Sequence, residues 1–345
     1  MQWMQGFILT AALSWALGRY LGPLGLLDVP QGRRRHGVPV PLTGGLALIT
    51  AVLIGVWLGW VTNPFTGTQS LAILGLGVLG FLDDRYNLRA RWKALGGLAI
   101  AVAVAYPAAA LLASSSVNLQ VLGLQLPHNP LLYFGLLVIL YWSVPQAVNL
   151  IDGANGLALG YGLILLLILA WQGAPQPFLL GTLVALLVFN WPRARHFLGD
   201  CGSLALGLML ALLATHAFGS HNPDALLWLF AYPILDVSLV VAIRLAQGQS
   251  PGHGDRSHLH FQWQDRCPAC SRAVVPWLWL NAGACALGAV ATGWLRLVPW
   301  LGLVSFGLQA SVFWLLAMRE HRSTDEPQPL PDQALRAPSQ PQAAA

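Results

Sequence analysis

The stretch LAILGLGVLGFLDDRYN, residues 71–87, joins an uninterrupted apolar run to two adjacent carboxylates, Asp83 and Asp84. Carboxylates are costly at a membrane boundary unless they are paired or solvated. A simple stop signal at the membrane surface would explain them, but Arg or Lys makes such a signal more cheaply because their long side chains reach back to water. Paired carboxylates can instead hold a hard divalent cation or accept a proton from an attacking group. We therefore favour a chemical role for this pair.

Apolar runs of this kind recur along the chain. Of its 345 residues, 56% are hydrophobic and 9% are charged, whereas roughly 25% of residues are charged in a soluble domain. A bilayer core is crossed by about 20 apolar residues, so the sequence predicts an all-α, polytopic membrane helix bundle of about eleven transmembrane helices. One domain is expected over residues 1–322, followed by a disordered cytoplasmic tail, 323–345, rich in Pro, Gln and Ala. The spans are expected near residues 3–21, 42–61, 69–82, 92–113, 130–148, 156–172, 176–190, 203–219, 225–243, 273–293 and 299–318.

Charge predicts the orientation of the bundle. Arg and Lys accumulate in cytoplasmic loops, so the run Arg33-Arg34-Arg35 after the first span places that loop inside and the N-terminus outside. The later basic loops then fall on the inner side, including the one with the single lysine, Lys93, and Arg296 alone lies clearly outside. Asp and Glu contribute little to topology, yet the aspartates also gather on the inner side. Carboxylates among arginines at one face suggest a metal and phosphate site there.

A second polar junction, QAVNLIDGANG at residues 146–156, separates two predicted spans and places Asn149, Asp152 and Asn155 around glycines. Gly153 would let the backbone approach a ligand closely. Asn, Asp and Gly are also ordinary turn residues, so a polar turn between helices is the alternative. A hairpin is expected near 118–130 because Val, Leu and Gln alternate there.

The third junction, FLGDCGS at residues 197–203, sets Asp200 between glycines just before another apolar run. As a helix cap, this carboxylate would accept hydrogen bonds from backbone amides at the helix start. As a chemical group, it would be an acid near the cytoplasmic membrane surface with room for a metal and a diphosphate. The residues alone leave both interpretations open.

The last inner loop contains GHGDRSHLH, residues 252–260, followed by CPAC, residues 267–270. Histidines and a CxxC pair could form a tetrahedral zinc site. Alternatively, the Arg256, His258 and His260 N–H groups bind phosphate oxygens and the cysteines only pack, since no disulfide framework is expected in a reducing compartment. Asp236 lies inside a predicted span, where a carboxylate is a functional candidate by default or forms a buried hydrogen bond to a neighbouring helix.

In this order, the motifs resemble the polyprenyl-phosphate N-acetylhexosamine-1-phosphate transferases, especially the bacterial WecA-like branch that uses undecaprenyl phosphate. The matching elements are Leu27–Pro30 with Arg33–His36, Pro41–Gly45, Asp83-Asp84, Asn149–Gly156, Phe197–Ser203, Pro233–Asp236 and Asp255–His260. The resemblance implies ten or eleven helices around a cytoplasmic active-site groove.

The resemblance also implies roles for individual residues. Asp200 would be the main magnesium ligand, with Asp83 as a second ligand. The Asp83-Asp84 pair would lie near the lipid phosphate, and His258 and His260 near the diphosphate. The implied substrate-binding residues are Gln146, Asn149, Asp152, Gly153, Asn155 and Arg256.

Three positions depart from the family's usual pattern. Gln146 stands where Asn is common, Asn155 where Asp is common, and Phe261 where the HxHH motif has its last histidine. Asn155 keeps an amide oxygen but lacks a carboxylate, and Phe261 removes an imidazole. These changes bear on which nucleotide or sugar is bound.

The expected activity is that of a Mg²⁺-dependent phosphotransferase, with Mn²⁺ as the alternative ion. It would move N-acetylhexosamine-1-phosphate, with N-acetylglucosamine favoured, from a UDP-sugar to undecaprenyl phosphate and release UMP. This would start a lipid-linked cell-envelope glycan at the bacterial cytoplasmic (inner) membrane. Asp83 or Asp84 would deprotonate the lipid phosphate or form a covalent intermediate. Membrane lipid is an expected partner, nucleic acid is not, and a homodimer is left open.

Two other classes compete with this activity. One is a weakly catalytic relative that binds lipid-linked sugar or acts as a scaffold, which the three departures motivate. The other is a membrane transporter, whose inverted repeat is not apparent in the sequence.

Overall fold

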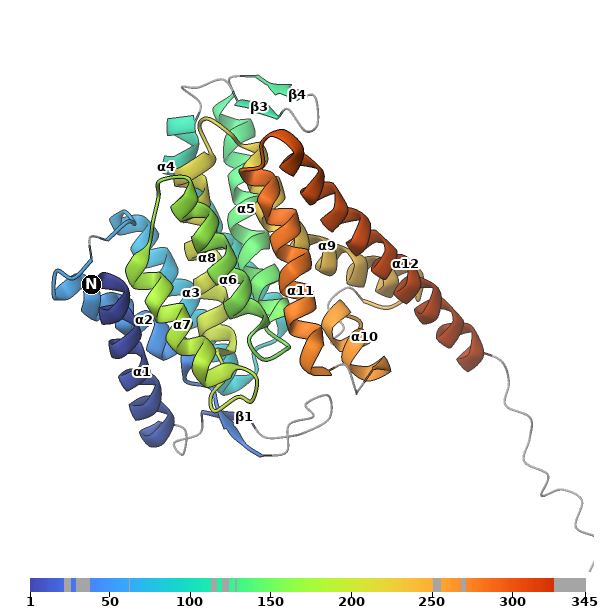
Figure 1. Cartoon of the computed structure of the whole chain (residues 1–345), viewed down its shortest axis with the longest axis horizontal. Coiled ribbons are helices and arrows are strands. Elements are labelled where there is room, and N and C mark those ends of the chain that lie inside the picture. Colours follow the sequence, from blue (N-terminus) through green and yellow to red (C-terminus); the bar gives the residue numbers. More distant parts are fainter. Residues whose placement is uncertain are drawn as a thin grey trace, which may run out of the picture.

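The computed structural model describes residues 1–21, 26–28, 38–61, 63–112, 117–119, 124–127, 129–250, 256–267 and 271–325. Its helices form a bundle (Figure 1). They are α1 (Gln2–Tyr20), α2 (Gly44–Trp57), α3 (Gly67–Tyr86), α4 (Ala90–Leu112), α5 (Pro130–Ile151), α6 (Leu157–Trp171), α7 (Pro177–Asn190), α8 (Gly199–Phe218), α9 (Asp224–Ala246), α10 (Leu259–Arg266), α11 (Ser271–Ala286) and α12 (Leu297–Asp325). Two 3₁₀ turns, η4 (Leu287–Ala289) and η5 (Gly293–Arg296), connect α11 with α12.

Each predicted span coincides with one of these helices, and only the short α10 was not predicted. The expected hairpin is confirmed, because β3 (Val117–Leu119) pairs antiparallel with β4 (Leu124–Leu126). A second small ribbon pairs β1 (Leu27–Asp28) with β2 (Val40–Pro41). The last helix continues three residues past the predicted domain end. The rest of the tail and the Arg33–Arg35 run lie outside the described residues.

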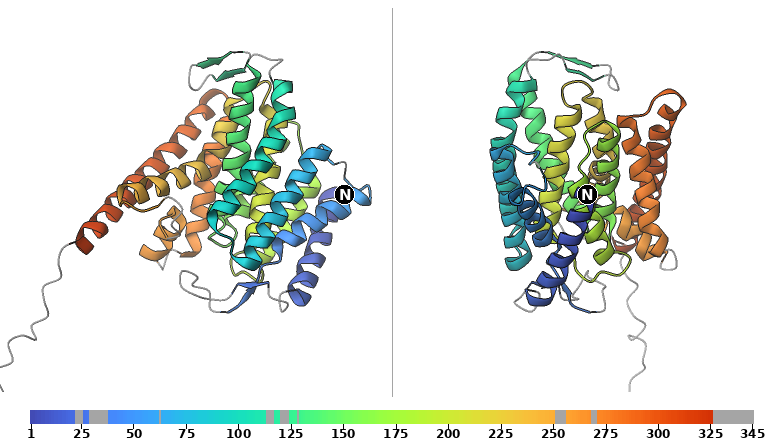
Figure 2. Two further views of the ribbon diagram at one scale, coloured as in Figure 1. Left: turned by 180° about the vertical axis from the view of Figure 1, so that it is seen from behind. Right: turned by 60° about the vertical axis from the view of Figure 1, so that its left-hand side comes forward.

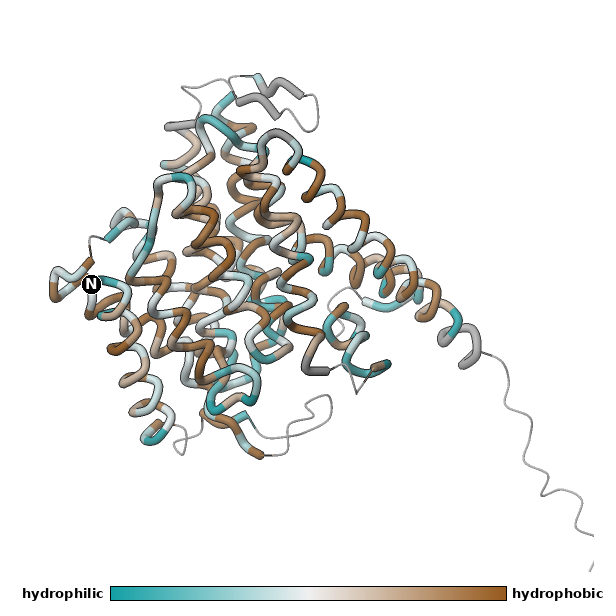
Figure 3. Tube along the Cα trace, in the orientation of Figure 1, coloured by the Kyte–Doolittle hydropathy of each residue, from teal (hydrophilic) through white to brown (hydrophobic). Residues whose placement is uncertain are grey.

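The composition of the helices supports an integral membrane bundle. Five of the described helices are long and apolar enough to cross a membrane, over Ala90–Ala109, Pro130–Ile151, Gly199–Phe218, Asp224–Ala246 and Trp294–Arg319. Four shorter apolar helices accompany them. Apolar colouring runs along the bundle helices, while polar colouring marks α10 and many connections (Figure 3). The number of crossings and the orientation stay predictions.

Helix α8 forms the centre of the bundle and is buried along nearly its whole length. It packs against α2, α3, α5, α6 and α9, and the turned views show it inside, with α1, α4 and α12 at the periphery (Figure 2). Small residues permit these close approaches. A Cβ atom on Gly207 would lie 2.6 Å from Cα of Pro145 in α5, and one on Gly45 in α2 would lie 2.2 Å from the Gly202 nitrogen.

The tightest approach that bears on function is between α3 and α8. A Cβ atom on Gly80 would lie 2.3 Å from both the carbonyl carbon and the oxygen of Asp200. Since these are backbone atoms, they cannot rotate away. Gly80 therefore sets the distance between the end of α3 and the start of α8.

The substitution Gly80→Ala is expected to lower the free energy of unfolding by about 1–3 kcal/mol, because it forces the two helix backbones apart. The measurement is thermal or denaturant unfolding of the purified protein in detergent. Gly135→Ala on α5 is the matched control, because a Cβ atom there has no neighbour within 4 Å. Equal stability of the two variants would contradict the close packing of α3 and α8.

Candidate active site

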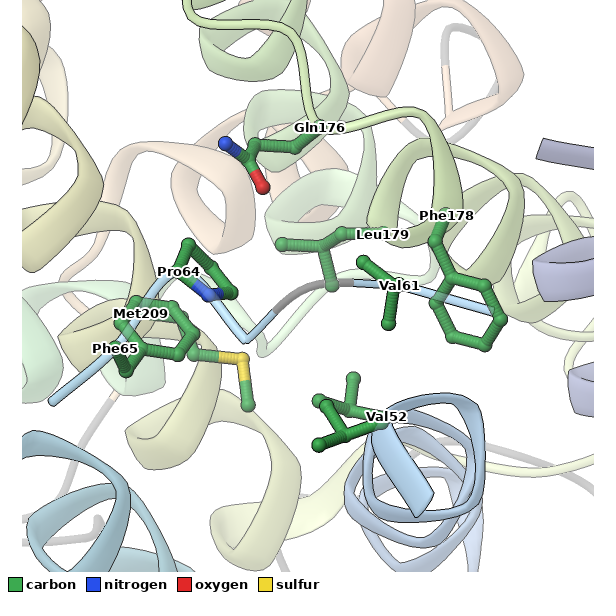
Figure 4. Close-up of a pocket in the computed structure, with 9 residues that line it drawn as sticks. Val52, Val61, Pro64, Phe65, Gln176, Phe178, Leu179 and Met209 are labelled. Carbon is green, nitrogen blue, oxygen red and sulfur yellow. The ribbon is translucent and has the colours of Figure 1, made fainter. Parts of the chain in front are cut away.

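A small, mainly apolar pocket lies beside the segment that leads into α3 (Figure 4). It is lined mainly by aliphatic and aromatic side chains, with Gln176 as the polar exception: Val52, Val56, Val61, Pro64, Phe65, Gln176, Phe178, Leu179 and Met209. Phe65 precedes the start of α3, whereas Asp83 lies near its end, about 25–30 Å away at 1.5 Å per helical residue. This pocket has no acid, base or phosphate-binding group, so the candidate site lies at the other end of α3.

Four helix ends meet in a polar cluster around Lys93, which lies in the first turn of α4. The Lys93 ammonium donates to Asp83 Oδ2 of α3 at 2.9 Å and to Asp200 Oδ2 of α8 at 2.6 Å. Asn149 of α5 donates through Nδ2 to Asp200 Oδ1 at 2.8 Å and to Ser203 Oγ at 2.9 Å. The three junctions predicted from the sequence thus supply one site.

The neighbouring residue, Asp84, caps α8. Its two carboxylate oxygens accept the backbone N–H groups of Asp200 and Cys201 at 2.9 and 3.0 Å. Gly199 makes room for it, because Gly199 has a φ of +71° and a Cβ atom there would lie 2.7 Å from Asp84 Oδ2. The capping role considered for Asp200 is therefore performed by Asp84. The Asp200 carboxylate is left to bind Lys93 and Asn149.

The crowded carboxylates are electrostatically perturbed. Burial, followed by the Asp200 carboxylate, raises the pKa of Asp83 to about 6, although Lys93 opposes this shift. Burial and the Asp200 charge raise the pKa of Asp84 to about 7. The pKa of Asp152, at the end of α5, is raised well above its usual range by burial and by Asp200 and Asp84. Several like charges held this close together favour binding of additional positive charge.

Lys93 is the residue that the sequence reasoning missed. It was interpreted only as a positive charge that orients the membrane helices. Its rarity could have identified it, because Lys93 is the only lysine in the sequence and all other Lys or Arg positions are arginines. A lysine presents a compact ammonium with three donors, which suits a position between two carboxylates.

The second half of the site is the start of α10, which is held by a buried carboxylate of α9. Asp236 is fully buried; its Oδ2 atom pairs with His258 Nδ1 at 2.8 Å, and its Oδ1 atom accepts the Leu259 N–H at 2.9 Å. His258 is the N-cap residue of α10 but makes no capping hydrogen bond itself. The alternative of a buried hydrogen bond for Asp236 is thus correct, and Asp236 caps α10 as Asp84 caps α8.

Removing this carboxylate should destabilise the protein. We expect Asp236→Ala to cost about 3–5 kcal/mol, because it leaves His258 and the start of α10 without their buried partner. Hydrogen exchange followed by mass spectrometry should show faster exchange of α10 amides. Ser238→Ala on the same helix is the control, since Ser238 bonds only to its own helix at Ile234. Unchanged protection of α10 in the Asp236 variant would refute this anchoring role.

The Lys93 cluster and the start of α10 are connected by the contact between Gly153 and His260. His260 is fully buried, and within the described part of the chain neither ring nitrogen has a hydrogen-bond partner. Burial lowers its pKa to about 3, so the imidazole is neutral. A Cβ atom on Gly153 would lie 2.5 Å from His260 Nε2. Because Asp152, the adjacent residue, lies in the field of Asp200 and Asp84, the histidine loop and the Lys93 cluster border one site.

Two predicted substrate-binding residues make other contacts. Asn155 donates to the Pro192 carbonyl at 3.3 Å, in the connection between α7 and α8. Gln146 packs toward α4, where a Cβ atom on Gly97 would lie 3.2 Å from its Nε2 atom. Neither side chain has a described contact with the Lys93 cluster, so their substrate-binding roles stay predictions.

The zinc alternative gains no support from the described residues. Cys267 is disulfide-bonded, contrary to the expectation of reduced cysteines, and a disulfide sulfur is not a thiolate ligand. His253 and Cys270 lie outside the described residues. Within the described ranges, no group of three or more His, Cys, Asp or Glu side chains is arranged to hold a metal.

Comparisons with known proteins place this geometry in a family context. Residues 66–217 match the sequence model of glycosyl transferase family 4. The undecaprenyl-phosphate alpha-N-acetylglucosaminyl 1-phosphate transferase of Escherichia coli (strain K12) is 27% identical over 321 residues, covering 87% of this chain and 86% of that protein. The protein of the same name from Yersinia pestis is 27% identical over 325 residues, with the same coverage.

A shorter match is found with a further relative. The probable undecaprenyl-phosphate N-acetylglucosaminyl 1-phosphate transferase of Bacillus subtilis (strain 168) is 30% identical over 155 residues, which cover 43% of this chain and 40% of that protein. The family match spans α3 to α8 and so contains Asp83, Lys93, Asn149 and Asp200. The part of the chain that is similar to glycosyl transferase family 4, residues 66–217, thus holds the Lys93 cluster.

Proposed function

We propose that this protein transfers N-acetylhexosamine-1-phosphate, with N-acetylglucosamine-1-phosphate as the first choice, from a UDP-sugar to undecaprenyl phosphate. The observation that carries the proposal is the Lys93 ammonium between Asp83 and Asp200 at the ends of apolar helices. The names of the similar E. coli and Y. pestis proteins support the same substrates.

The reaction is a phosphoryl transfer. A phosphate oxygen of undecaprenyl phosphate attacks the phosphorus that carries the sugar, the bond from this phosphorus to the oxygen of the UMP phosphate breaks, and UMP leaves. Catalysis of such a step is mostly positioning and electrostatic stabilisation. The acceptor tail remains in the bilayer, which explains why the charged groups lie at the ends of membrane helices.

Asp83 is the better candidate for accepting the proton of the acceptor phosphate. Both oxygens of Asp84 accept hydrogen bonds from the first amides of α8, whereas Asp83 accepts one from the side chain of Lys93. The Lys93 ammonium, which donates to two carboxylate oxygens, can donate to a phosphate oxygen in place of one of them. In this mechanism Lys93 binds the donor diphosphate, and Asn149 keeps the Asp200 carboxylate oriented.

We propose Mg²⁺ as the cofactor, with Mn²⁺ as the alternative, held by Asp200 and Asp83. The two residues fit this role because their Oδ2 atoms both lie within hydrogen-bonding distance of one ammonium, so they already converge on a cation. Mg²⁺ in phosphate sites is bound by one or two carboxylates together with water and substrate phosphates. When bound, the ion would offset the negative charge of the diphosphate.

The second half of the site, at the start of α10, would bind the UDP-sugar donor. His258 and His260 lie at the start of α10, with Arg256 just before it, and their N–H groups suit phosphate oxygens. Asp152, whose raised pKa favours a protonated carboxyl group, could donate a hydrogen bond to the nucleotide-sugar. The product would start a lipid-linked envelope glycan at a bacterial inner membrane. A homodimer stays a prediction, and no described contact favours the scaffold or transporter alternatives.

The test is a transfer assay with the purified protein. Radiolabelled UDP-N-acetylglucosamine, undecaprenyl phosphate and Mg²⁺ should give a labelled product that extracts into organic solvent, together with UMP. Other UDP-N-acetylhexosamines, tested in parallel, would identify the preferred sugar. Absence of a lipid-linked product with all of them would refute the proposed function.

A further inference from the structure

One face of α10 holds the side chain of Arg256. Phe261 and Asp265 lie one helical turn apart on this helix, and both contact the guanidinium. The Arg256 Cζ atom lies 4.2 Å from the centroid of the Phe261 ring. Asp265 accepts from Nε and Nη2 of Arg256 at 2.8 Å each. The Phe261 ring therefore contacts the face of the Arg256 guanidinium, and the Asp265 carboxylate binds its edge.

The two contacts restrain different motions. A carboxylate that takes two parallel N–H bonds fixes the plane of a guanidinium, and an aromatic ring beneath it fixes its height through the cation–π attraction. The Arg256 carbonyl also accepts from Gln262 Nε2 at 3.2 Å, which ties the backbone to the same helix. Arg256 is therefore preorganised by α10 itself.

The edge of the Phe261 ring lies against the loop that follows α5. A Cβ atom on Gly153 would lie 2.7 Å from Cζ of Phe261 and 2.5 Å from Nε2 of His260. The ring therefore lies close to both Gly153 and Arg256, and its position depends on the loop that carries Asp152. This arrangement connects Arg256 to the loop bordering the Lys93 cluster.

We propose that Phe261 and Asp265 are positioning residues that hold Arg256 for contact with a phosphate of the nucleotide-sugar donor, an inference that rests on the proposed function. Phe261 has no N–H group to give to a phosphate, so it cannot do what a histidine at this position would do. Its ring instead orients a permanent positive charge. The departure at position 261 thus replaces an imidazole with a ring that orients the Arg256 guanidinium.

A double-mutant cycle tests this mechanism. Phe261→Leu, which keeps an apolar side chain but removes the ring, should raise the KM for UDP-N-acetylglucosamine about threefold to tenfold. Arg256→Gln should raise it about tenfold to a hundredfold. Because Phe261 acts through Arg256, the double variant should match Arg256→Gln alone. The KM for undecaprenyl phosphate should change in none of them.

Asp265→Asn provides a second, independent route. It should raise the donor KM about tenfold, and this effect should also vanish when Arg256→Gln is present. Tyr86→Leu is the control, because it removes a ring that lies 5.9 Å from the Arg85 guanidinium without touching Arg256. Its donor KM should equal that of the wild type.

Additive effects in either cycle, or equal changes in the KM values of donor and acceptor, would overturn the inference. Calorimetric titration of the same variants with UDP-N-acetylglucosamine separates it from the proposed function. A wild type that binds this donor in a manner dependent on Arg256 and Phe261, but transfers nothing, would refute the function and support the inference. A wild type that neither binds nor transfers would refute both.

Discussion

The Asp200→Asn variant is expected to lose transfer activity by about a thousandfold or more while remaining folded. The substitution keeps the shape of the side chain but removes the charge that binds Lys93 at 2.6 Å. Because Asp84 rather than Asp200 caps α8, the helix start should persist. Initial rates and the thermal unfolding midpoint of the purified variant give the two readouts.

Asp224→Asn is the control for this prediction. Asp224 is a buried aspartate in the first turn of α9, whereas the Lys93 cluster is formed by residues of α3, α4, α5 and α8. Its variant should turn over at the wild-type rate. If Asp200→Asn also retained wild-type turnover, Asp200 would have no part in the chemistry.

The Lys93→Met variant is expected to reduce kcat about a hundredfold to a thousandfold. Methionine has a similar length but no charge, so Asp83 and Asp200 would lose the ammonium that joins them at 2.9 and 2.6 Å. Two uncompensated carboxylates repel each other and the substrate phosphates. Steady-state kinetics with both substrates measure the effect.

Arg91→Met separates a specific role of Lys93 from a general loss of positive charge. Arg91 is two residues away in α4 and lies over the neighbouring Trp92 ring at 5.3 Å. We expect its kcat to stay within about twofold of the wild type. Equal losses in both variants would show that Lys93 acts only through the net charge of the surface.

Much of the architecture could be predicted because membrane helices are determined by local composition. The expected spans coincide with helices, although α3 continues past its predicted end at residue 82 to Tyr86. The apolar run ends there, but Asp83 and Asp84 stay helical because Lys93 and the α8 amides satisfy their carboxylates. Asn87 ends the helix with a left-handed φ of 50°. Contacts with distant residues therefore extend α3 beyond the end of its apolar run.

The sequence predicts most residues of the candidate site, but it does not predict which of them form hydrogen bonds with each other. The sequence shows polar residues at the ends of apolar runs, namely Asp83, Asn149 and Asp200. In the structure these residues lie in one cluster. The spacing of residues along the chain does not show that Asp84 caps a helix more than a hundred residues away. Nor does it show that Asp236 anchors His258. Such pairings arise from tertiary packing, which a single sequence does not display.

The most direct test of the central claim is the fate of a labelled phosphate. UDP-N-acetylglucosamine carrying ³²P in the phosphate next to the sugar is incubated with the purified protein, undecaprenyl phosphate and Mg²⁺. If the protein transfers sugar-1-phosphate, the label moves into the lipid fraction and unlabelled UMP is released. Label that stays in water-soluble UDP while the sugar moves to lipid, or label that does not leave the donor at all, would contradict the account.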